Sequence, residues 1–353
     1  MSGDSQSPEG PAAKKKSSFK PRMSPREIVS SMREFKNLRV LVVGDLFLDE
    51  YIEGEMYEIS KEGPIPVIRI EAKSQTAGAA GNLASSIRNL GAKVSMVGLV
   101  GEDPNGEVLL SQLRAKGIRV SGVLSDPNMP TLTYSKVRAR VESTPSKEIL
   151  RMDVLPARPL DRKIGERVLH KVQSEGSGVD AIIVLDQIHH LITQAFLKEL
   201  PGIARKERAL LHGSSRDHLV NFRSFDLITP NDREAEGATG ASGGSFDGVE
   251  RLGRALQRKG AHKKVLLTLG PRGMVAFPDR GAVERLPTYA RSVVDVTGAG
   301  DAVSSVSVLG NILGWDLGSL AWAASQAAAI AVEHVGTYHV SALELEERIL
   351  EEG

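Results

Sequence analysis

The sequence contains no cysteine in its 353 residues. Without cysteine the chain cannot form disulfide bonds, thiolate zinc sites or cysteine nucleophiles, and this absence fits a cytoplasmic protein. The chain also lacks an uncharged apolar run near the roughly 20 residues that a membrane-spanning helix needs. Its longest apolar region, AWAASQAAAIAV, is short and rich in alanine, which indicates a buried helix. We therefore expect no association with the membrane.

Net charge is nearly absent as well, at +1. A chain with so little excess charge has no electrostatic basis for nucleic acid as its main partner. The hydrophobic fraction of 41% and the charged fraction of 25% are typical of a protein that buries a sizeable core. No internal repeat is evident. The length favours one large α/β domain, or such a domain with an insert.

The start of the chain lacks apolar periodicity and is rich in Ser, Pro, Gly and Lys. No apolar segment follows its charged residues, so it is not a secretory signal. The run of lysines at residues 14–16 could contact an anionic surface, but a solvated segment is the favoured interpretation. We predict a disordered tail over residues 1–34 and a single domain over residues 35–353.

From Arg39 onward, strand-like and helix-like segments alternate. The segment RVLVVGD is a short β-branched apolar run that is typical of a buried parallel strand. Helical patterns follow in GAAGNLASSIRNLGA and PNGEVLLSQLRAKG. This alternation predicts an α/β fold with a doubly wound, mostly parallel sheet and helices on both faces. Segments near 51–72 and 131–153 instead alternate apolar and polar residues, and we predict that they form a small antiparallel sheet projecting from the domain.

The stretch VVDVTGAGDAV carries the strongest chemical signal. Gly298, Ala299 and Gly300 precede Asp301 at the expected start of a helix, where free backbone N–H groups can surround an anion. Asp301 could orient a hydroxyl nucleophile and accept its proton. Orientation is the larger contribution, because a carboxylate of pKa ~3.9 is a weak base for an alcohol. The alternative is an ordinary helix start with an acidic first turn.

A second small-residue stretch, TAGAAGNLASSIRNLGA, also precedes a helix. Together the two stretches resemble the PfkB (ribokinase-like) carbohydrate kinase family, over nearly the whole chain after the tail. The resemblance implies a ribokinase-like fold with a small β lid, and ATP and Mg²⁺ as cofactors. It implies that Gly78 and Asn82 line the sugar pocket. It also implies that Gly298, Ala299 and Gly300 form the anion hole beside the catalytic Asp301.

Further segments resemble the nucleotide side of this family. In TPNDREAE, Asn231 and Glu234 match residues that organise metal-bound phosphates, with Glu234 acting on Mg²⁺ through water. The alternative is a helix N-cap at Asn231 with an acid in the first turn.

Three more residues match positions that approach the nucleotide. In TLGPRGMVAF these are Thr268, Gly270 and Gly273, although a Gly-x-x-Gly is also an ordinary turn between strands. In HVGTYHV, Gly336 resembles part of the loop beside adenine, and a helix C-cap is the alternative.

The segment VVGDLFLDEYIEGEMYEISKEGPIPVIRIE most resembles the D-glycero-β-D-manno-heptose 7-phosphate kinases of the family. The resemblance implies that Asp45 and Asp49 bind sugar hydroxyls, because a carboxylate readily accepts hydrogen bonds from hydroxyl groups. Either aspartate could instead cap a turn. Lys136 and Arg138, with Lys61 and Arg151, could bind a sugar phosphate, although cations on such strands are more often solvated.

The acceptor side also departs from those kinases. Paired glutamines are replaced by Lys147-Glu148, a tyrosine-lysine-glycine segment by residues 187–190, and an Asp-Pro-Lys by residues 212–214. A lysine that would contact phosphate is therefore missing. The phosphoryl-transfer residues match the family better than the acceptor side does.

We expect an ATP-dependent kinase that phosphorylates heptose 7-phosphate at the anomeric hydroxyl. A kinase for another sugar or sugar phosphate, or a non-catalytic nucleotide- or sugar-binding regulator, remains open. A dinucleotide dehydrogenase is disfavoured because the first strand lacks a Gly-x-Gly-x-x-Gly turn. The family resemblance implies a homodimer through the lid strands. Because the chain ends soon after the last expected helix, we expect no fused nucleotidyltransferase domain.

Overall fold

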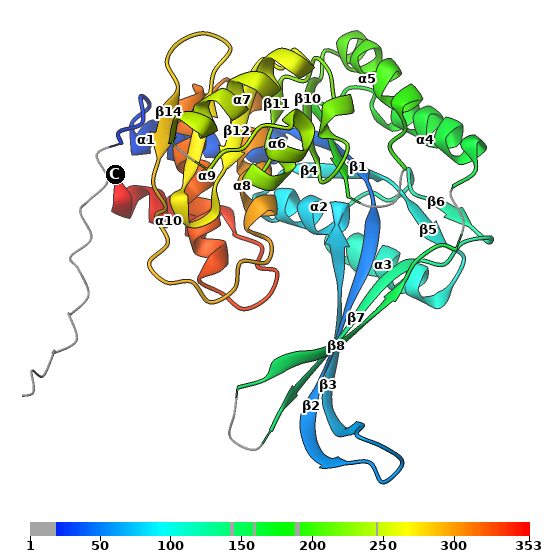
Figure 1. The fold of residues 1–353 in the computed structure, drawn as a ribbon. Coiled ribbons are helices and arrows are strands. Elements are labelled where there is room, and N and C mark those ends of the chain that lie inside the picture. The colour runs from blue at the N-terminus through cyan, green and yellow to red at the C-terminus, as the bar shows by residue number, and fades with distance from the viewer. Residues whose placement is uncertain (1–18, 142–144, 158–159, 188–190, 245) are drawn as a thin grey trace, which may run out of the picture.

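A main body and a smaller projecting sheet make up the protein (Figure 1). The computed structural model describes residues 19–141, 145–157, 160–187, 191–244 and 246–353. In this part of the chain the main sheet has eight strands, in the order β14 (Glu284–Leu286), β13 (Met274–Phe277), β12 (Lys264–Thr268), β11 (Leu227–Ile228), β10 (Leu210–Ser215), β9 (Ala181–Asp186), β1 (Arg39–Gly44) and β4 (Lys93–Val97). The strands from β12 to β4 are parallel, whereas β13 and β14 pair antiparallel at one edge.

The main sheet is buried on both faces, as the apolar run in β1 predicts. Val40 and Val42 belong to the core on one face, and Leu41 and Val43 belong to the core on the other, because successive side chains of a strand point in opposite directions. The first core is covered by α1 (Pro25–Met32), α2 (Ala80–Asn89), α3 (Pro104–Ala115), α8 (Ala299–Ile312), α9 (Leu317–Val332) and α10 (Ala342–Glu352). The second is covered by α4 (Arg162–Glu175), α5 (Gln194–Glu207), α6 (Asp232–Thr239) and α7 (Phe246–Gly260).

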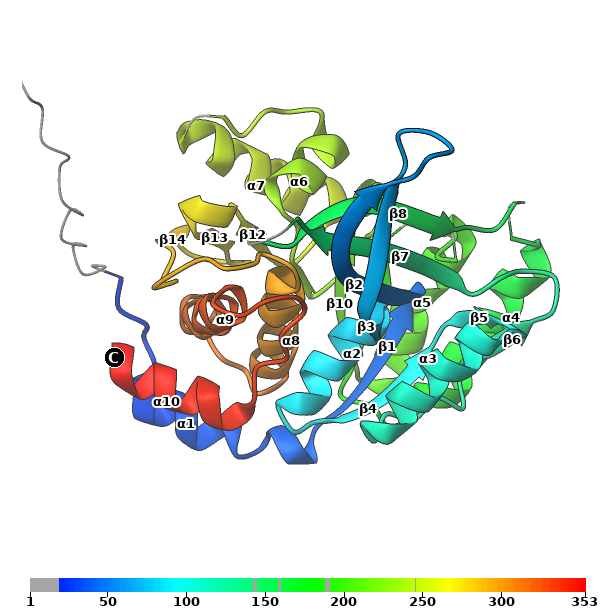
Figure 2. The ribbon, with the colours of Figure 1, turned by 90° about the horizontal axis from the view of Figure 1, so that it is seen from below.

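Helices therefore lie on both faces of the sheet, and Figure 2 shows β12 and β13 between α6 and α7 on one side and α8 and α9 on the other. The predicted doubly wound α/β class is confirmed. A short parallel pair, β5 (Leu99–Gly101) and β6 (Leu124–Asp126), lies outside the main sheet. Three 3₁₀ turns complete the described elements, at Phe35–Asn37, Leu219–Asn221 and Gly270–Arg272.

The projecting sheet has the strand order β3 (Pro66–Ala79), β2 (Leu46–Ile59), β7 (Leu132–Arg140) and β8 (Lys147–Val154). It arises in the two regions for which the sequence predicts lid strands. The prediction that it is antiparallel is wrong at its centre, where β2 and β7 run parallel. The two central strands come from separate hairpins, so their relative direction depends on tertiary contacts that hairpin patterns do not encode.

The predicted tail is too long. Helix α1 begins with a capping box, in which Ser24 Oγ accepts from Glu27 N–H and Glu27 accepts from Ser24 N–H at 2.7 Å. Ile28 and Met32 are buried against the core. Burial of these two side chains holds the helix on the domain, so residues 25–32 belong to the fold. Residues 1–18 lie outside the described part of the chain.

None of the helices in the described residues combines the length and the apolar character needed to cross a membrane.

Candidate active site

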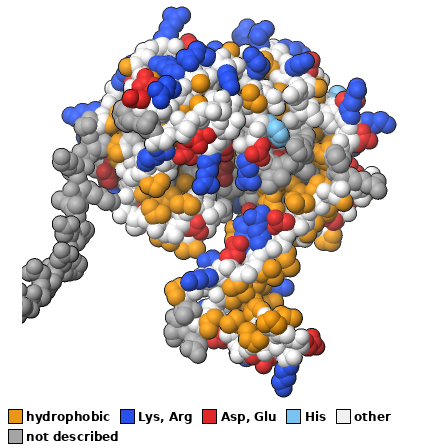
Figure 3. Space-filling view, in the orientation of Figure 1, with side chains coloured by type: hydrophobic (Ala, Val, Ile, Leu, Met, Phe, Trp, Pro, Cys, Tyr) orange, Lys and Arg blue, Asp and Glu red, His pale blue; other side chains and the backbone are white. Residues whose placement is uncertain are grey.

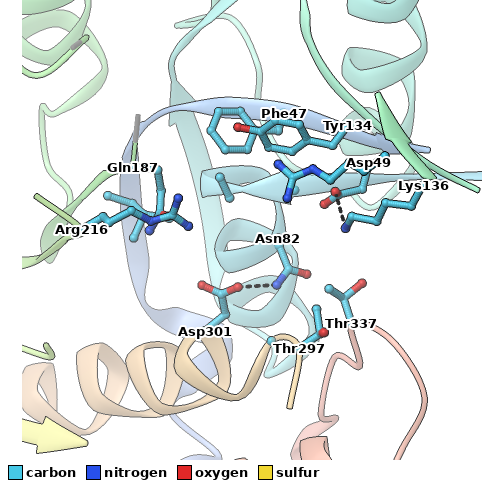
Figure 4. A pocket seen from close by; sticks show the side chains of 15 residues that line it. Phe47, Asp49, Asn82, Tyr134, Lys136, Gln187, Arg216, Thr297, Asp301 and Thr337 are labelled. Carbon is cyan, nitrogen blue, oxygen red and sulfur yellow. Dashed lines mark hydrogen bonds and ion pairs between the residues drawn. The ribbon is translucent and has the colours of Figure 1, made fainter. Parts of the chain in front are cut away.

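A cavity of about 270 Å³ opens where the projecting sheet meets the main sheet (Figure 4). Its walls come from the ends of β9 and β10, the starts of α2 and α8, and all four strands of the projecting sheet. Ligands of doubly wound sheets bind beyond the carboxyl ends of the strands, so this cavity is the candidate active site. The predicted site residues that line it are Asp49, Gly78, Asn82, Lys136, Gly298 and Asp301.

The start of α8, where the resemblance predicts an anion hole, lies at this cavity. Gly298 has a φ of +83°, a conformation that glycine adopts without strain, and it turns the chain into the helix. A side chain at Gly300 would meet no other atom within 4 Å, so this backbone can be approached closely. One correction is needed, because Ala299 N–H donates to Val296 O at 3.3 Å. The N–H groups of Gly298, Gly300 and Asp301 remain without an acceptor in the described structure.

Asp301 lies in the first turn of α8, beside those N–H groups. Asn82, from the first turn of α2, donates from Nδ2 to Asp301 Oδ2, as the dashed line in Figure 4 shows. Burial raises the pKa of Asp301 to about 6, although the Asn82 hydrogen bond acts to lower it. A base with a pKa near the working pH is more effective than an unperturbed carboxylate. The arrangement therefore suits proton transfer better than the sequence alone indicates.

The residues predicted to organise metal-bound phosphates begin α6. Asn231 Oδ1 accepts from Glu234 N–H, and Glu234 Oε2 accepts from Asn231 N–H, both at 2.9 Å. This capping box is the alternative that the sequence left open. Glu234 Oε1 has no partner in the described residues, so one oxygen is available. Burial raises the pKa of Glu234 to about 7, against the lowering effects of Asn231 and of the charge on Arg216.

This donor set fits a cation that is held mainly by phosphates and water. The described residues contain no group of three or more His, Asp or Glu side chains that could hold a metal alone. Mg²⁺ commonly retains several waters and takes only one or two protein carboxylates. Thr229, directly after β11, contacts Ser304 of α8 at 2.8 Å between hydroxyl oxygens, which joins this phosphate side to the helix of Asp301.

Of the other predicted nucleotide residues, Thr268 ends β12, and Gly270 and Gly273 lie in and directly after the 3₁₀ turn at Gly270–Arg272. Thr268 N–H donates to Pro230 O at 2.9 Å, which holds the end of β12 beside Asn231. Gly273 has a φ of +85°, and an added Cβ would lie 2.0 Å from Leu286 O, so this glycine is required by the turn. The space around Gly270 is open. None of the three lines the cavity.

Gly336 does not cap a helix, because α9 ends at Val332 with Glu333 as its C-cap. Its N–H instead donates to Asp295 Oδ2 at 3.0 Å, and Asp295 Oδ1 accepts from Thr297. These bonds hold the loop of Gly336 against the segment that leads into the anion hole. The neighbouring Thr337 lines the cavity.

The projecting sheet forms the side of the cavity where the resemblance predicts that the acceptor binds. Lys136 Nζ lies 2.8 Å from Asp49 Oδ1. Burial acts to lower the pKa of Lys136, but the interactions with Asp49 and Tyr51 outweigh it and raise the pKa. At Gly78, an added Cβ would lie 2.4 Å from Asp49 Oδ2, so the glycine provides room for this carboxylate.

Comparison with known proteins decides the family. The model of the pfkB family carbohydrate kinases matches residues 39–145 and 213–344, which is more than half of the chain. The chain belongs to the PfkB family. It is a phosphotransferase with an alcohol group as acceptor, that is, an ATP-dependent carbohydrate kinase with a small-molecule substrate. The predicted family and enzyme class are confirmed.

Two similar curated proteins are bifunctional proteins HldE. The chain is 32% identical to that of Geobacter metallireducens over 325 residues and 33% identical to that of Geobacter sulfurreducens over 311 residues. These alignments cover 92% and 87% of this PfkB chain, but only 65% and 62% of the relatives. The chain therefore spans less than two thirds of their length.

Solved structures of kinases share the fold. The tetrameric inhibited form of phosphofructokinase-2 from Escherichia coli has a TM-score of 0.73 at 17% identity, covering 89% of this chain and 99% of that one. Arabidopsis thaliana ribokinase complexed with ribose and ATP has a TM-score of 0.64 at 20% identity, covering 89% and 98%. The ribokinase-like fold of this PfkB protein is confirmed.

Two predicted acceptor residues lie away from the PfkB cavity. Asp45 is fully buried, and its Oδ2 accepts from Gln187 N–H at 2.8 Å, so it secures the chain at the end of β9. Arg138 pairs with Glu53 at 3.3 Å. Neither lines the cavity. Residues 188–190, where the sequence departs from the heptose kinases, lie outside the described structure.

Two cavity arginines are more prominent than the sequence suggests. Arg151, only weakly indicated, lies over the Tyr134 ring at 4.2 Å and pairs with Asp153. Arg216, which sequence reasoning missed, follows β10 and has no acidic partner at salt-bridge distance among the described residues. Its position directly after a strand end, two residues beyond the missing lysine, was the available signal. Figure 4 shows it beside Gln187.

Proposed function

We propose that this PfkB kinase transfers the γ-phosphoryl group of ATP to the anomeric hydroxyl of D-glycero-β-D-manno-heptose 7-phosphate. The observation that carries the proposal is the composition of the cavity. Asp301 and the start of α8 form one wall, and the remaining lining includes three cations, Lys136, Arg151 and Arg216. Such a cavity suits a sugar that presents a hydroxyl at one end and a phosphate at the other.

In the proposed reaction, Asp301 orients the acceptor hydroxyl and accepts its proton as the hydroxyl oxygen bonds to phosphorus and ADP departs. The N–H groups of Gly298 and Gly300 donate to the charge that develops on the transferred group. Mg²⁺ would neutralise the phosphates, with Glu234 holding it through water. Closure of the projecting sheet as a lid would keep water from competing with the sugar.

Two residues near the end of β10 bear on the identity of the sugar phosphate. Ser214 occupies the position where the resemblance expects a phosphate-binding lysine, and this difference supports another sugar phosphate as the second candidate. Arg216 supports the first candidate, because it supplies a cation near the same strand end. The positive charge of Arg216 also acts to lower the pKa of Glu234. This interaction favours a position of the Arg216 side chain between the sugar phosphate and the nucleotide.

The deciding experiment is ADP release with Mg²⁺-ATP across a panel of sugars and sugar phosphates. We expect turnover with heptose 7-phosphate, at least 10³-fold reduced in Asp301→Asn. Asp279→Asn, an exposed acid outside the cavity, is the matched control and should retain activity. Turnover with a different acceptor rejects the heptose assignment alone. No turnover with any acceptor, while ATP still binds, would support a regulator instead.

The role of Glu234 is tested separately through the metal. Glu234→Gln removes the charge but can preserve the capping box, because a glutamine oxygen still accepts from Asn231 N–H. We expect a several-fold rise in the Mg²⁺ concentration for half-maximal activity, with an unchanged KM for the sugar. An unchanged Mg²⁺ requirement rejects this role.

We also propose that the projecting sheet pairs two copies of the chain. All eight residues of β8 are exposed. The projecting sheet and the connection between β2 and β3 carry apolar side chains that are about half exposed: Ile59, Ile65, Ile70, Ile149, Leu150 and Met152. Figure 3 shows hydrophobic side chains gathered on the visible face of this sheet. Apolar patches of this kind mark interfaces. Light scattering should give a dimer for the wild type and a monomer for Leu150→Asp. A monomeric wild type rejects the proposal.

A further inference from the structure

A chain of hydrogen bonds runs from Asp301 away from the cavity. Asn82 Nδ2 donates to Asp301 Oδ2, and Asn82 Oδ1 lies 2.8 Å from His339 Nε2. His339 Nδ1 in turn lies 3.5 Å from Lys116 Nζ. The four residues come from α8, α2, the segment before α10 and the residue that follows α3. Side chains that are distant in sequence are thus linked to the catalytic carboxylate.

The chemistry of these groups fixes the direction of each hydrogen bond. A lysine ammonium group has donors and no acceptor, so His339 Nδ1 must accept from Lys116. Burial, with the charge of Lys116, lowers the pKa of His339 to about 4, and the imidazole is therefore neutral at physiological pH. Its single proton is then on Nε2, which donates to Asn82 Oδ1.

This donor decides which way the Asn82 amide faces. An asparagine amide can turn over and exchange its oxygen and nitrogen with little change in shape. If Asn82 turned over, its NH₂ group would face the Nε2–H of His339, and its oxygen would face the carboxylate of Asp301. Both contacts would be repulsive. The observed orientation satisfies all three groups and leaves Asp301 Oδ1 without a partner in the described residues, hence available to a hydroxyl.

We propose that His339 is a positioning residue, which holds the Asn82 amide so that it donates to one oxygen of Asp301 and leaves the other to the acceptor. The inference deepens the proposed kinase mechanism and rests on it for its catalytic part. The charged side chains that share the cavity with Asp301 are Asp49, Lys136, Arg151 and Arg216, and all of them stay intact in the tests below.

The first test needs no activity. It is a double-mutant cycle in thermal unfolding at pH 8, with His339→Leu, Asp301→Asn and the combined variant. We expect the changes in Tm to be non-additive, because the orientation of Asn82 matters less once residue 301 is an amide that can both donate and accept. Additive changes would overturn the proposal.

The matched control for this cycle is His334→Leu. His334 belongs to the same segment and stacks on Tyr338 at 3.7 Å, but its Nδ1 is bonded to Ile330 O and not to Asn82. It should combine additively with Asp301→Asn. If His339→Leu folds poorly, His339→Gln provides the second variant, because the glutamine amide can present a donor where Nε2 lies.

The second test is the pH dependence of kcat/KM with the acceptor that the panel identifies. In His339→Leu we expect the acidic limb to move up by roughly 0.5–1 pH unit, because the carboxylate loses a donor. This lowers kcat/KM at pH 6 by roughly 2- to 5-fold beyond any change at pH 8.5. His339→Gln should return the acidic limb of kcat/KM to its wild-type pH.

A limb that does not move in His339→Leu, or that moves equally in both variants, refutes the positioning role. Absence of turnover in the wild type refutes the proposed function instead. In that case the double-mutant cycle still decides whether His339 acts on Asp301.

Discussion

Replacing Asp301 by asparagine should stabilise the protein at neutral pH while it removes the proposed catalytic base. Burial raises the pKa of this carboxyl from 3.8 to about 6. The folded state therefore binds the proton more tightly than the unfolded chain does. The stabilisation due to that proton is complete below about pH 4 and is lost as pH rises through about 6. Above this range the wild type pays the cost of a buried charge that asparagine avoids.

The magnitude follows from the shift of about two pH units. Each unit corresponds to ~1.4 kcal/mol, which gives an upper limit of about 3 kcal/mol. Because the side chain is only partly buried, solvent screens part of this cost, and we expect ~1–3 kcal/mol. For a chain of 353 residues this amounts to a Tm increase of roughly 1–4 °C.

The assay is thermal unfolding of wild type and Asp301→Asn from pH 5 to pH 8.5. The difference in Tm should grow with pH and level off above about pH 7. Asp295→Asn is the control, and we expect it to change the stability in the opposite direction. Burial acts to raise the pKa of Asp295, but hydrogen bonds from Thr297 and Gly336 outweigh it and lower the pKa, so this variant should lose stability at neutral pH. A folded Asp301→Asn that is less stable than wild type at pH 8, or a difference independent of pH, refutes the reasoning.

Three further predictions concern catalysis. First, kcat/KM should rise with pH to a limb near pH 6, because Asp301 must lose its proton to act, and a flat profile between pH 5 and 7 would contradict this assignment. Second, Lys136→Met should raise the KM for the acceptor sugar at least 10-fold and leave the KM for ATP unchanged. Equal effects on both KM values would show that Lys136 does not bind the acceptor. Third, Gly78→Ala should reduce activity at least 10-fold, because the added methyl group would displace the Asp49 carboxylate. Wild-type kinetics in this variant would show that the position of Asp49 is unimportant.

Much of the fold could be predicted because its signals are local. Apolar runs such as RVLVVGD and the amphipathic helices between them repeat along the chain, and they suffice for a parallel sheet with two covered faces. The parallel pairing of β2 with β7 could not be predicted, because it joins two hairpins that are far apart in sequence. Helix α1 was missed for a different reason. Its capping box, Ser24 to Glu27, is visible in the sequence but lies in a polar context that favoured disorder.

In the candidate site, too, the residues with a local sequence pattern could be predicted, whereas the contacts between distant segments could not. Asp301 and the glycines before it could be found because a helix start that binds an anion needs small residues in consecutive positions. Asn82 and Asp301 are 219 positions apart, and His339 is 257 positions from Asn82, so no local pattern predicts their contacts. Asp45 is the opposite case, because its local pattern predicts a role that the fold does not support. Its position directly after a strand suggests that it binds a ligand, but in the fold its side chain is buried and accepts a hydrogen bond from Gln187 N–H.

The two halves of the cavity have different origins, and this explains why one half matches the family better. The proposed anion hole depends on backbone N–H groups at the start of α8, where few residue types allow the geometry. The acceptor half consists of side chains on the projecting sheet and at the ends of β9 and β10. There, a cation can be supplied from several neighbouring positions, as Arg216 is near the site of the absent lysine. Substrate choice can therefore change on the projecting sheet while phosphoryl transfer stays intact.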